Sequence, residues 1–245
     1  MDALIIAAGY GSRLAGLSPS KPLTPVNGVP IIELSIRQAM RAGVTRVVVV
    51  TGHEALRVES FLAELSRRLQ IVIEPVRLAD WSTPNGHSVI AGAARCAGNY
   101  LLLMADHLFS APILSALIDQ SSDAHALTLA VDWRLNNPLV DPDDATWVEI
   151  DGDGLIVAIG KTIAHYHAVD CGAFLATPAL AEAIRAAIAA GQPGSLSDGV
   201  QMLARQQRAA TLDIGTAWWI DIDDPHYHAL AEATAPCHFA PTVDG

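Results

Sequence analysis

The chain has 245 residues, 51% of them hydrophobic, and its 15 Lys and Arg against 26 Asp and Glu give a formal net charge of −11. This length and hydrophobic content fit a single α/β domain over residues 1–245 with a large core, and they exclude a disordered chain. The acidic balance, without any basic run, argues against a nucleic-acid or anionic-membrane partner.

A glycine-rich loop follows the first predicted strand. Residues 4–8 form a short apolar run that breaks into Gly9-Tyr-Gly11-Ser-Arg13, and a Lys-Pro pair follows at Lys21. A buried strand that feeds a glycine-rich turn brings backbone N–H groups up to phosphates. Arg13 and Lys21 place two cations beside this loop, which favours a triphosphate site over a plain strand-to-helix turn. The candidate nucleotide-site residues are Ala7, Ala8, Gly9, Gly11, Ser12, Arg13 and Lys21.

Two common nucleotide motifs are absent from the sequence. The dinucleotide fingerprint G-x-G-x-x-G requires a third glycine at position 14, where the chain has Leu14. It also requires an acidic residue about twenty positions further on, at a strand end. Glu33 lies near that distance, but Pro30 at a predicted helix start places it inside a helix. The P-loop pattern G-x-x-x-x-G-K-[ST] does not occur either.

Helices and strands alternate after this loop. Pro30 to Ala42 has helical periodicity, and the valine-rich run from Arg46 to Thr51 is typical of a buried parallel strand. A second helix carries Val58, Phe61, Leu62, Leu65 and Leu69 on one face, and Ile71 to Ile73 is a third strand. This order predicts an α/β fold with a doubly wound, mostly parallel sheet.

A polar, turn-rich segment from Ala79 to Ser88 precedes a helix predicted at about Val89 to Ala97. Such a loop lies at the carboxyl end of the sheet, where ligands bind in open α/β folds. Asn85 and Ser88 carry the amide and hydroxyl groups that can read a base edge. Ser88 also suits the N-cap of the following helix, and that role is compatible with base contact.

A carboxylate follows the next predicted strand directly. Tyr100 to Ala105 is a buried strand, and Asp106-His107 comes at its end. A carboxylate at the tip of a central strand is costly unless something binds it. Mg²⁺ prefers oxygen ligands and bridges carboxylates to phosphates. We therefore predict that Asp106 binds Mg²⁺ rather than only capping a helix.

Residues 126–176 are rich in predicted strands. The runs Trp147 to Ile150 and Leu155 to Ile159 flank Asp151-Gly-Asp-Gly154, which is a hairpin signal. We predict that this region is a small β-rich insertion over one side of the cleft. Lys161 follows the hairpin and is predicted to bind a phosphate; a solvated hairpin lysine is the alternative.

Two carboxylates recur near the C-terminus, after helices predicted at Pro178 to Ala190 and Ser195 to Gln207. Asp221 and Asp223 lie two positions apart, so on a strand both side chains point to one face. Like charges on one face are unfavourable without a counter-ion. The tail, residues 236–245, contains proline and is predicted to be loose.

No apolar run approaches the length needed to cross a bilayer, so no membrane insertion is expected. The N-terminus has no basic segment ahead of its apolar run, so we expect no signal peptide and a cytoplasmic location. Cys96, Cys171 and Cys237 are odd in number and widely spaced, which favours free thiols. Neither His165-Tyr-His167 nor His226-Tyr-His228 has the spacing of a tetrahedral zinc set, so surface positions are favoured for them.

The segment AAGYGSRL…SPSKPLTPVNGVPII resembles the signature of the sugar-nucleotide type nucleotidyltransferases, G-x-G-x-R followed by P-K-P-L and G-x-P-[LI]-[IL]. The resemblance implies a Rossmann-like, GT-A-like fold whose glycine loop wraps a nucleoside triphosphate. It implies that Arg13 and Lys21 hold the phosphates. It also implies a metal site at Asp106, completed by Asp221 and Asp223 of a W-x-D-[IV]-D-[TDS]-P element.

The remaining site assignments also come from this resemblance. The Asn85-Gly86-x-Ser88 stretch resembles the one that reads cytosine in the cytidylyltransferase branch of the family. The middle of the chain looks most like the CTP:inositol-1-phosphate cytidylyltransferases, which often carry D-T-G where this chain has Asp170-Cys-Gly. Those proteins are often fused to a membrane-embedded CDP-alcohol phosphotransferase, and this sequence has no such second half. The residues assigned to the acceptor are His107, Lys161 and Asp170, with Lys161 as the cation for the acceptor phosphate. The predicted β-rich insertion then lies over the acceptor side of the cleft.

The sequence therefore predicts an Mg²⁺-dependent cytidylyltransferase that transfers CMP from CTP to a phosphorylated small alcohol, with inositol 1-phosphate as the best candidate. The predicted catalytic cations are Arg13, Lys21 and Lys161. Phosphocholine, a phosphonate, or a sugar phosphate with another nucleotide remain open as alternatives. A nucleotide-binding regulatory subunit without turnover is a different class, which the intact set of cations and carboxylates disfavours. The sequence leaves open whether the chain forms a homo-oligomer.

Overall fold

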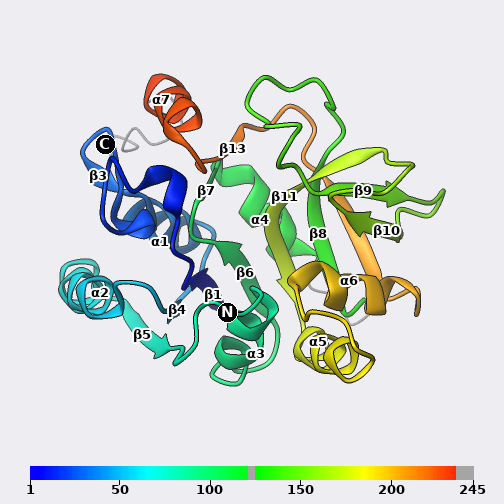
Figure 1. Cartoon of the computed structure of the whole chain (residues 1–245), viewed down its shortest axis with the longest axis horizontal. Helices are drawn as coiled ribbons and strands as arrows, with labels where there is room; N and C mark the ends of the chain where they lie inside the picture. The colour runs from blue at the N-terminus through cyan, green and yellow to red at the C-terminus, as the bar shows by residue number, and fades with distance from the viewer. Residues whose placement is uncertain (121–124, 236–245) are drawn as a thin grey trace.

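The computed structural model describes residues 1–120 and 125–235 of the chain. A nine-stranded mixed sheet runs through it, in the order β10-β9-β11-β6-β1-β4-β5, and β8 pairs with both β11 and β12 (Figure 1). Strands β6, β1, β4 and β5 are parallel to one another, whereas β11 is antiparallel to its neighbours. The strands are β1 (Asp2–Ala7), β4 (Arg46–Thr51), β5 (Val72–Arg77), β6 (Tyr100–Met104), β8 (Leu127–Asp132), β9 (Trp147–Ile150), β10 (Ile156–Gly160), β11 (Ala168–Ala176) and β12 (Ala209–Asp213).

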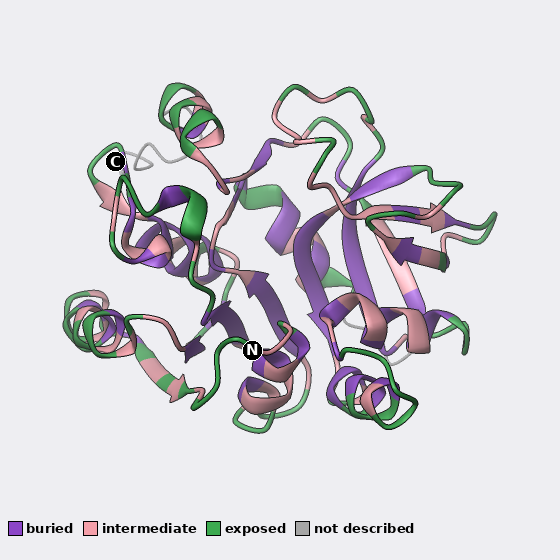
Figure 2. Cartoon of the chain, viewed as in Figure 1, coloured by how far each residue is buried: buried purple, intermediate pink, exposed green. Residues whose placement is uncertain are grey.

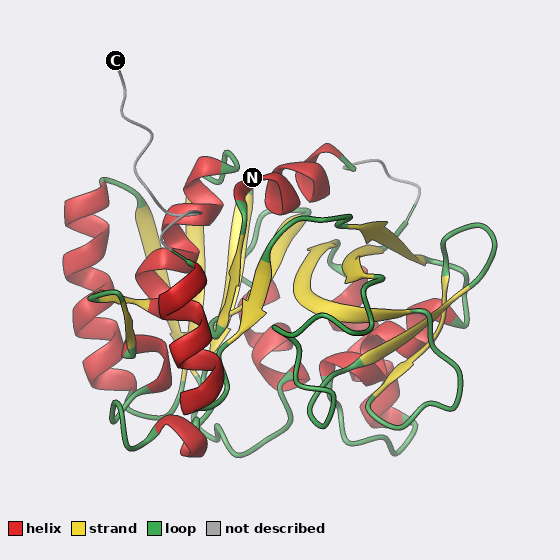
Figure 3. Cartoon of the chain, turned by 90° about the horizontal axis from the view of Figure 1, so that it is seen from above, coloured by secondary structure: helices red, strands yellow, loops and turns green. Residues whose placement is uncertain are grey.

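Helices cover both faces of this sheet, as Figure 3 shows. Alternate residues of β1 enter two separate cores, Ala3 and Ile5 on one face and Leu4 and Ile6 on the other, because successive strand side chains point in opposite directions. One core packs against α1 (Ile31–Arg41), α2 (Ala55–Leu69) and α4 (Ala111–Asp119), and the other against α3 (Gly86–Ala93), α5 (Ala179–Ala189) and α6 (Leu196–Ala204). The central strands are accordingly buried along most of their length (Figure 2). The predicted doubly wound α/β fold is confirmed.

Two small sheets lie beside the main one. The antiparallel pair β7 (His107–Phe109) and β13 (Trp219–Asp221) joins the segment after β6 to the C-terminal part of the chain. The hairpin β2 (Pro25–Val26) and β3 (Val29–Pro30) precedes α1, and α7 (Pro225–Thr234) packs near it over a third apolar cluster. This arrangement returns the C-terminal segment to the end of β6.

The structure differs from the sequence prediction in several elements. The β-rich region is not a separate insertion, because β8 and β11 are hydrogen-bonded members of the main sheet. Strand β5 extends to Arg77, beyond the predicted end at Ile73, and tolerates Pro75 because it is the edge strand. Helices α4 and α7 were not predicted, although each has proline in its first turn, a common start signal.

The predicted helix after the polar segment begins earlier than expected. Asn85 occupies the N-cap position of α3, so the prediction that Ser88 caps this helix is wrong. Ser88 instead lies in the first turn and is 5% exposed. For α6, by contrast, Ser195 is the N-cap and forms a capping box with Asp198. The predicted loose tail at 236–245 and Cys237 lie outside the described residues.

Candidate active site

The glycine-rich loop lies at the carboxyl end of β1 and lines one cavity of about 270 Å³. Gly11 has a φ of 63°, and a Cβ on it would meet the side chain of Lys21, so this position requires glycine for two reasons. Ala8 is buried beneath the loop, and its carbonyl accepts the His53 N–H at 3.0 Å. The lining includes most of the predicted nucleotide-site residues, namely Ala7, Gly9, Gly11, Ser12, Arg13, Lys21 and Asp106, together with Asp223.

The carboxylates meet because of the β7–β13 pairing. In that pair Asp221 lies opposite His107, and the Ile222 N–H donates to the Asp106 carbonyl at 3.0 Å. His107 Nδ1 is 2.7 Å from Asp106 Oδ1 and 3.5 Å from Asp221 Oδ1. Possible ligand atoms of Asp106, His107 and Asp221 all lie within 4.8 Å of one another. The strand itself ends at Asp221, and Asp223 reaches the site from the following segment.

The cations and carboxylates of the site alternate in one ionic network. Lys21 Nζ is 2.5 Å from Asp106 Oδ2 and also pairs with Asp223. Arg13 Nη2 is 2.8 Å from Asp223 Oδ2 and 2.6 Å from Asp144 Oδ2. Lys161 closes the series by pairing with the other oxygen of Asp144. The network thus runs from the carboxylate at the tip of β6 to the lysine after β10.

Burial and mutual proximity shift the pKa values within this group. Burial alone would lower the pKa of Lys21, but Asp106, Asp221 and Asp223 raise it above its ordinary value. Burial would raise the pKa of Asp106, but Lys21 and His107 hold it well below its usual range. Burial would lower the pKa of His107, but the carboxylates of Asp221 and Asp106 raise it to about 9. Burial and the neighbouring carboxylates raise the pKa of Asp221.

These residues fit a hard divalent cation. Asp221 Oδ1 is buried and accepts no hydrogen bond from any described residue. Both oxygens of Asp223 already face Lys21 and Arg13. Carboxylate oxygens of Asp106 and Asp221 are the donor type that Mg²⁺ prefers, whereas an imidazole is not. The absence of a hydrogen bond to Asp221 Oδ1 and the raised pKa of this carboxyl group mark the place where a cation would relieve repulsion.

His107 forms part of the floor of a second cavity. Its side chain is 12% exposed, and its ring stacks against Phe109 and Trp219, whose ring centroids lie 6.3 and 6.0 Å away. Gly172, with a φ of 75°, lies against the ring edge, where a Cβ would come within 2.5 Å of Cδ2. Packing therefore fixes the imidazole with Nδ1 towards Asp106.

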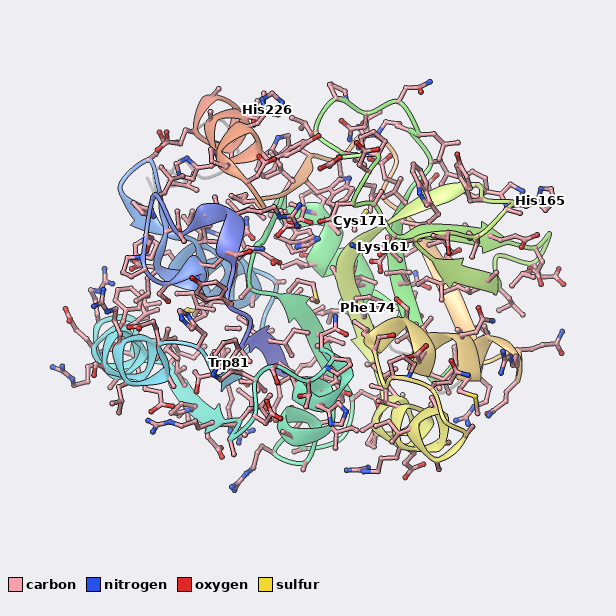
Figure 4. The ribbon with its side chains drawn as sticks, viewed as in Figure 1. Trp81, Lys161, His165, Cys171, Phe174 and His226 are labelled. Carbon is pink, nitrogen blue, oxygen red and sulfur yellow. The ribbon has the colours of Figure 1, made fainter. Side chains whose placement is uncertain are left out.

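The second cavity, of about 260 Å³, adjoins the first and shares Asp106 and Asp223 with it. The predicted acceptor residues His107, Lys161 and Asp170 all line it, as do Asp141, Asp144, Phe174, Trp219 and Asp221. In Figure 4, Lys161 and Phe174 lie towards the middle of the molecule, whereas His165 and His226 lie at its outer edge, well apart. Burial raises the pKa of Asp170 to about 6, although the Gly172 N–H and His107 oppose this rise.

The predicted base-reading segment contacts a different part of the chain from the glycine loop. Asn85 lines the second cavity, and its Oδ1 accepts the Leu196 N–H at 2.8 Å. Gly86 begins α3 and packs against the Gly194 carbonyl, and Ser88 is buried behind it. A role in base recognition for Asn85, Gly86 and Ser88 therefore stays a prediction.

Sequence reasoning missed Asp144 as a site residue. Its partners Arg13 and Lys161 are 131 and 17 positions away, and no local pattern shows that they meet. Composition offered one overlooked signal, since lysine occurs at only two positions of the chain, Lys21 and Lys161. Both reach the same network, which argues against the alternative of a lysine that is merely solvated at a hairpin.

A sequence model of the MobA-like NTP transferase domain matches residues 3–209. The chain belongs to this family. The nucleotidyltransferase resemblance inferred from the sequence is thereby confirmed.

Known relatives of this NTP transferase domain extend the comparison. The chain is 30% identical over 235 residues to a "Bifunctional IPC transferase and DIPP synthase" of Rubrobacter xylanophilus, covering 95% of the chain and 51% of that relative. It is 30% identical over 245 aligned residues to a "CMP-5'-(3-aminopropyl)phosphonate synthase" of Streptomyces rubellomurinus, covering 91% of the chain and 37% of the relative. The chain thus spans about half the length, or less, of these curated relatives.

A solved structure shares the fold of this chain. It is the inositol-1-phosphate CTP transferase from T. maritima, with a TM-score of 0.82 and 23% sequence identity, covering 92% of this chain and 90% of that one. At this level of identity the likeness shows the common fold. No helix within 1–120 and 125–235 combines the length and apolar character needed to cross a bilayer.

Proposed function

We propose that this protein transfers CMP from CTP to a phosphorylated small alcohol, with inositol 1-phosphate as the best candidate, and releases pyrophosphate. The observation that carries the proposal is a pair of adjoining cavities that share Asp106 and Asp223. One is lined by the glycine loop and the other by Lys161. Two relatives whose names specify inositol-1-phosphate or IPC transfer support the choice of acceptor.

On the nucleotide side, the backbone of Gly9, Gly11 and Ser12 offers N–H groups to the triphosphate, because the loop ends a parallel strand. Arg13 and Lys21 neutralise the charge on the α-phosphate and on the leaving pyrophosphate. Their carboxylate partners in the ionic network hold both cations in place before substrate arrives. This preorganisation reduces the rearrangement needed during the reaction.

Asp106 and Asp221 would hold Mg²⁺. When bound, the ion would supply positive charge to the nucleotide phosphates. Asp223 stays a further predicted ligand: its oxygens face Arg13 and Lys21, just as those of Asp106 face Lys21 and His107. His107 orients Asp106 through the 2.7 Å contact of Nδ1. Because its ring is packed, His107 can hold the Asp106 carboxylate in position and also line the acceptor cavity.

The chemistry is a direct displacement at phosphorus. An oxygen of the acceptor phosphate forms a bond to the α-phosphorus of CTP, and the bond from that phosphorus to the oxygen bridging to the β-phosphate breaks. Pyrophosphate leaves with the bridging oxygen. A phosphate is already an anionic nucleophile, so no strong base is required, and the residues contribute positioning and charge neutralisation.

On the acceptor side, Lys161 binds the acceptor phosphate, and Asp170 accepts hydrogen bonds from the remainder of the acceptor. The carboxyl group of Asp170 is half-buried, and within the described residues it accepts a hydrogen bond only from the Gly172 N–H, at 2.7 Å. A hydroxyl group of a polyol offers the missing donor.

An amino-bearing phosphonate is a second candidate acceptor. Asp141 and Asp170 both line the acceptor cavity, and neither forms a salt bridge with another described residue. Two unpaired carboxylates suit an ammonium group as well as hydroxyl groups. The similarity to a relative named for aminopropylphosphonate makes this alternative specific.

The experiment is a pyrophosphate-release screen with purified protein and Mg²⁺, using four nucleoside triphosphates against inositol 1-phosphate, phosphocholine, an aminoalkylphosphonate and a sugar 1-phosphate. We expect turnover with CTP and inositol 1-phosphate. Turnover only with an aminoalkylphosphonate would favour the second candidate, and binding without turnover for every pair would indicate a regulatory nucleotide-binding protein. Calorimetry should show CTP binding more tightly than UTP or a purine triphosphate. A cytoplasmic location and any homo-oligomer stay predictions.

A further inference from the structure

Asp144 is the one member of the ionic network to which the proposed function gives no individual role. It lies between β8 and β9, and each of its carboxylate oxygens takes a different cation. Oδ2 is 2.6 Å from Arg13 Nη2, and Oδ1 pairs with Lys161. Arg13 follows β1 on the nucleotide side, whereas Lys161 follows β10 on the acceptor side. One side chain therefore connects the cations of both cavities.

The two cations depend on Asp144 to different degrees. Arg13 has a second carboxylate partner, Asp223. Lys161 has no other salt bridge to the described part of the chain, and its side chain is 58% exposed. An exposed lysine with several rotatable bonds has no fixed position of its own, because holding it costs side-chain entropy. The position of Lys161 is thus set by Asp144.

The proposed reaction offers a reason why Asp144 should connect Arg13 and Lys161. Bond formation requires the acceptor oxygen to lie about 3–3.5 Å from the phosphorus that it attacks. Both reacting groups are anionic phosphates, and the cations that hold them repel each other at short range. A carboxylate between the two cations removes that repulsion and fixes their separation.

We propose that Asp144 is a positioning residue that sets the separation of Arg13 and Lys161, and thereby brings the acceptor phosphate to the α-phosphate of the nucleotide. The proposal rests on the proposed function for its kinetic consequence, but the Asp144–Lys161 link can be measured without turnover. The alternative is a resting counter-ion that phosphate simply displaces. Loss of such a counter-ion would leave catalysis unchanged or strengthen acceptor binding.

The kinetic test is a double-mutant cycle with whichever nucleotide and acceptor the screen turns over. Lys161→Ala alone should raise the acceptor KM about ten- to hundredfold and barely change the nucleotide KM, since it removes one charge-assisted contact. Asp144→Asn should lower kcat/KM for the acceptor by at least about tenfold. In the Asp144→Asn background, Lys161→Ala should add less than about threefold, because the lysine is already misplaced.

The matched control is Asp143→Asn. Asp143 is the neighbouring residue of the same loop, it is exposed, and it lines neither cavity. Its kinetic constants should stay within about twofold of the parent, the range expected for a surface change. Additive effects of Lys161→Ala and Asp144→Asn, or a kcat/KM for Asp144→Asn within threefold of the parent, would overturn the proposal.

A second measurement separates failure of this proposal from failure of the proposed function. Because the chain has only two lysines, protein labelled with ¹⁵N-lysine gives two side-chain ammonium signals. Asp144→Asn should shift and broaden the Lys161 signal, since a charge-assisted hydrogen bond to carboxylate is lost. Asp143→Asn should leave both signals in place. An unmoved Lys161 signal in Asp144→Asn would contradict the link, even if no substrate pair had been found.

Discussion

The sequence predicted three of the site residues because each follows a predicted strand or its loop: Arg13, Lys21 and Asp106. The carboxyl ends of parallel strands meet at one edge of a sheet, so residues just beyond β1 and β6 become neighbours. The structure places Lys21 Nζ 2.5 Å from Asp106 Oδ2. Lys21, beside the loop, thus contacts the first predicted metal ligand.

Replacing Asp106 with asparagine tests the metal assignment. Asparagine keeps the shape but removes the charge, and a charge-assisted contact of this kind contributes about 1.5–3 kcal/mol. Mg²⁺-dependent pyrophosphate release should therefore fall by about ten- to hundredfold or more, with unchanged circular dichroism. Asp119→Asn, an exposed change at the end of α4, is the control. Turnover of Asp106→Asn within tenfold of the parent would rule out Asp106 as a metal ligand.

Other site residues could not be found from local sequence. Asp144 gains its role from Arg13 and Lys161, which lie on other elements of the sheet. The resemblance predicted Asp221 as a site residue. Its contact with His107 depends on the β7–β13 pairing, which joins positions more than a hundred residues apart. Pairing of two three-residue strands leaves no periodicity in the sequence.

At the scale of elements, β11 forms part of the lining of the second cavity. One edge of β11 pairs with β8 over its length, while the other edge pairs first with β9 at Ala168 and Val169 and then with β6 from Ala173 onwards. Residues 170–172 lie at this change of partner, where the register with β8 also shifts. Gly172 adopts its positive φ there and admits the His107 ring.

Gly172→Ala should therefore disturb both β11 and the site. An alanine would be strained at a φ of 75° and would collide with His107, so we expect a loss of about 1–3 kcal/mol in the free energy of unfolding. Urea denaturation measures the loss. Gly152→Ala, in the β9–β10 turn, meets nothing within 4 Å and should stay within about 0.5 kcal/mol of the parent. Equal stability of the two variants would refute this account of β11.

Asp132, at the end of β8, links three elements from a fully buried position. It accepts hydrogen bonds from Arg134 Nε at 2.8 Å, Asn137 Nδ2 at 2.9 Å and Trp219 Nε1 at 2.8 Å. Burial would raise the pKa of Asp132, but these contacts, led by Arg134, hold it below its ordinary value. Asp132→Asn should cost about 1.5–3 kcal/mol near neutral pH.

The same group gives a pH dependence of stability with a definite sign. A depressed folded-state pKa stabilises the protein above the unfolded-state value of about 3.9, and this contribution is lost as the pH falls through the lower folded-state value. The difference in unfolding free energy between parent and Asp132→Asn should thus be constant above about pH 5 and shrink below about pH 4. Asp153→Asn, an exposed change in the hairpin turn, is the control. A difference that grows in acid would contradict the assignment.

Elements with strong periodicity were predictable, and those defined by tertiary contacts were not. The apolar runs of β1, β4 and β6 and the amphipathic faces of α1 and α2 are visible in the sequence. The start of α3 was misplaced because Asn85 and Gly86 dock against residues 194–196, and this contact fixes the helix start. The β-rich region looked like an insertion because its pairing with β6 runs through β11 alone.

At the scale of the whole molecule, we propose that the chain unfolds as one cooperative unit. Both large apolar cores contain residues from the parallel and the antiparallel parts of the sheet. Neither part can lose its packing without exposing the other. Scanning calorimetry should give one transition with a ratio of calorimetric to van't Hoff enthalpy near about 1. Two resolved transitions would instead indicate two separately folding units.

The continuity of β11 between the two halves has a consequence for substrate choice. This single strand is hydrogen-bonded to β6, β8 and β9, and a close-packed sheet of this kind deforms little. If the proposed function holds, we therefore expect the spacing between the two cavities to stay constant. Acceptors should then be selected by their length from the phosphate to the far end of the second cavity, because the sheet does not open to admit a longer one.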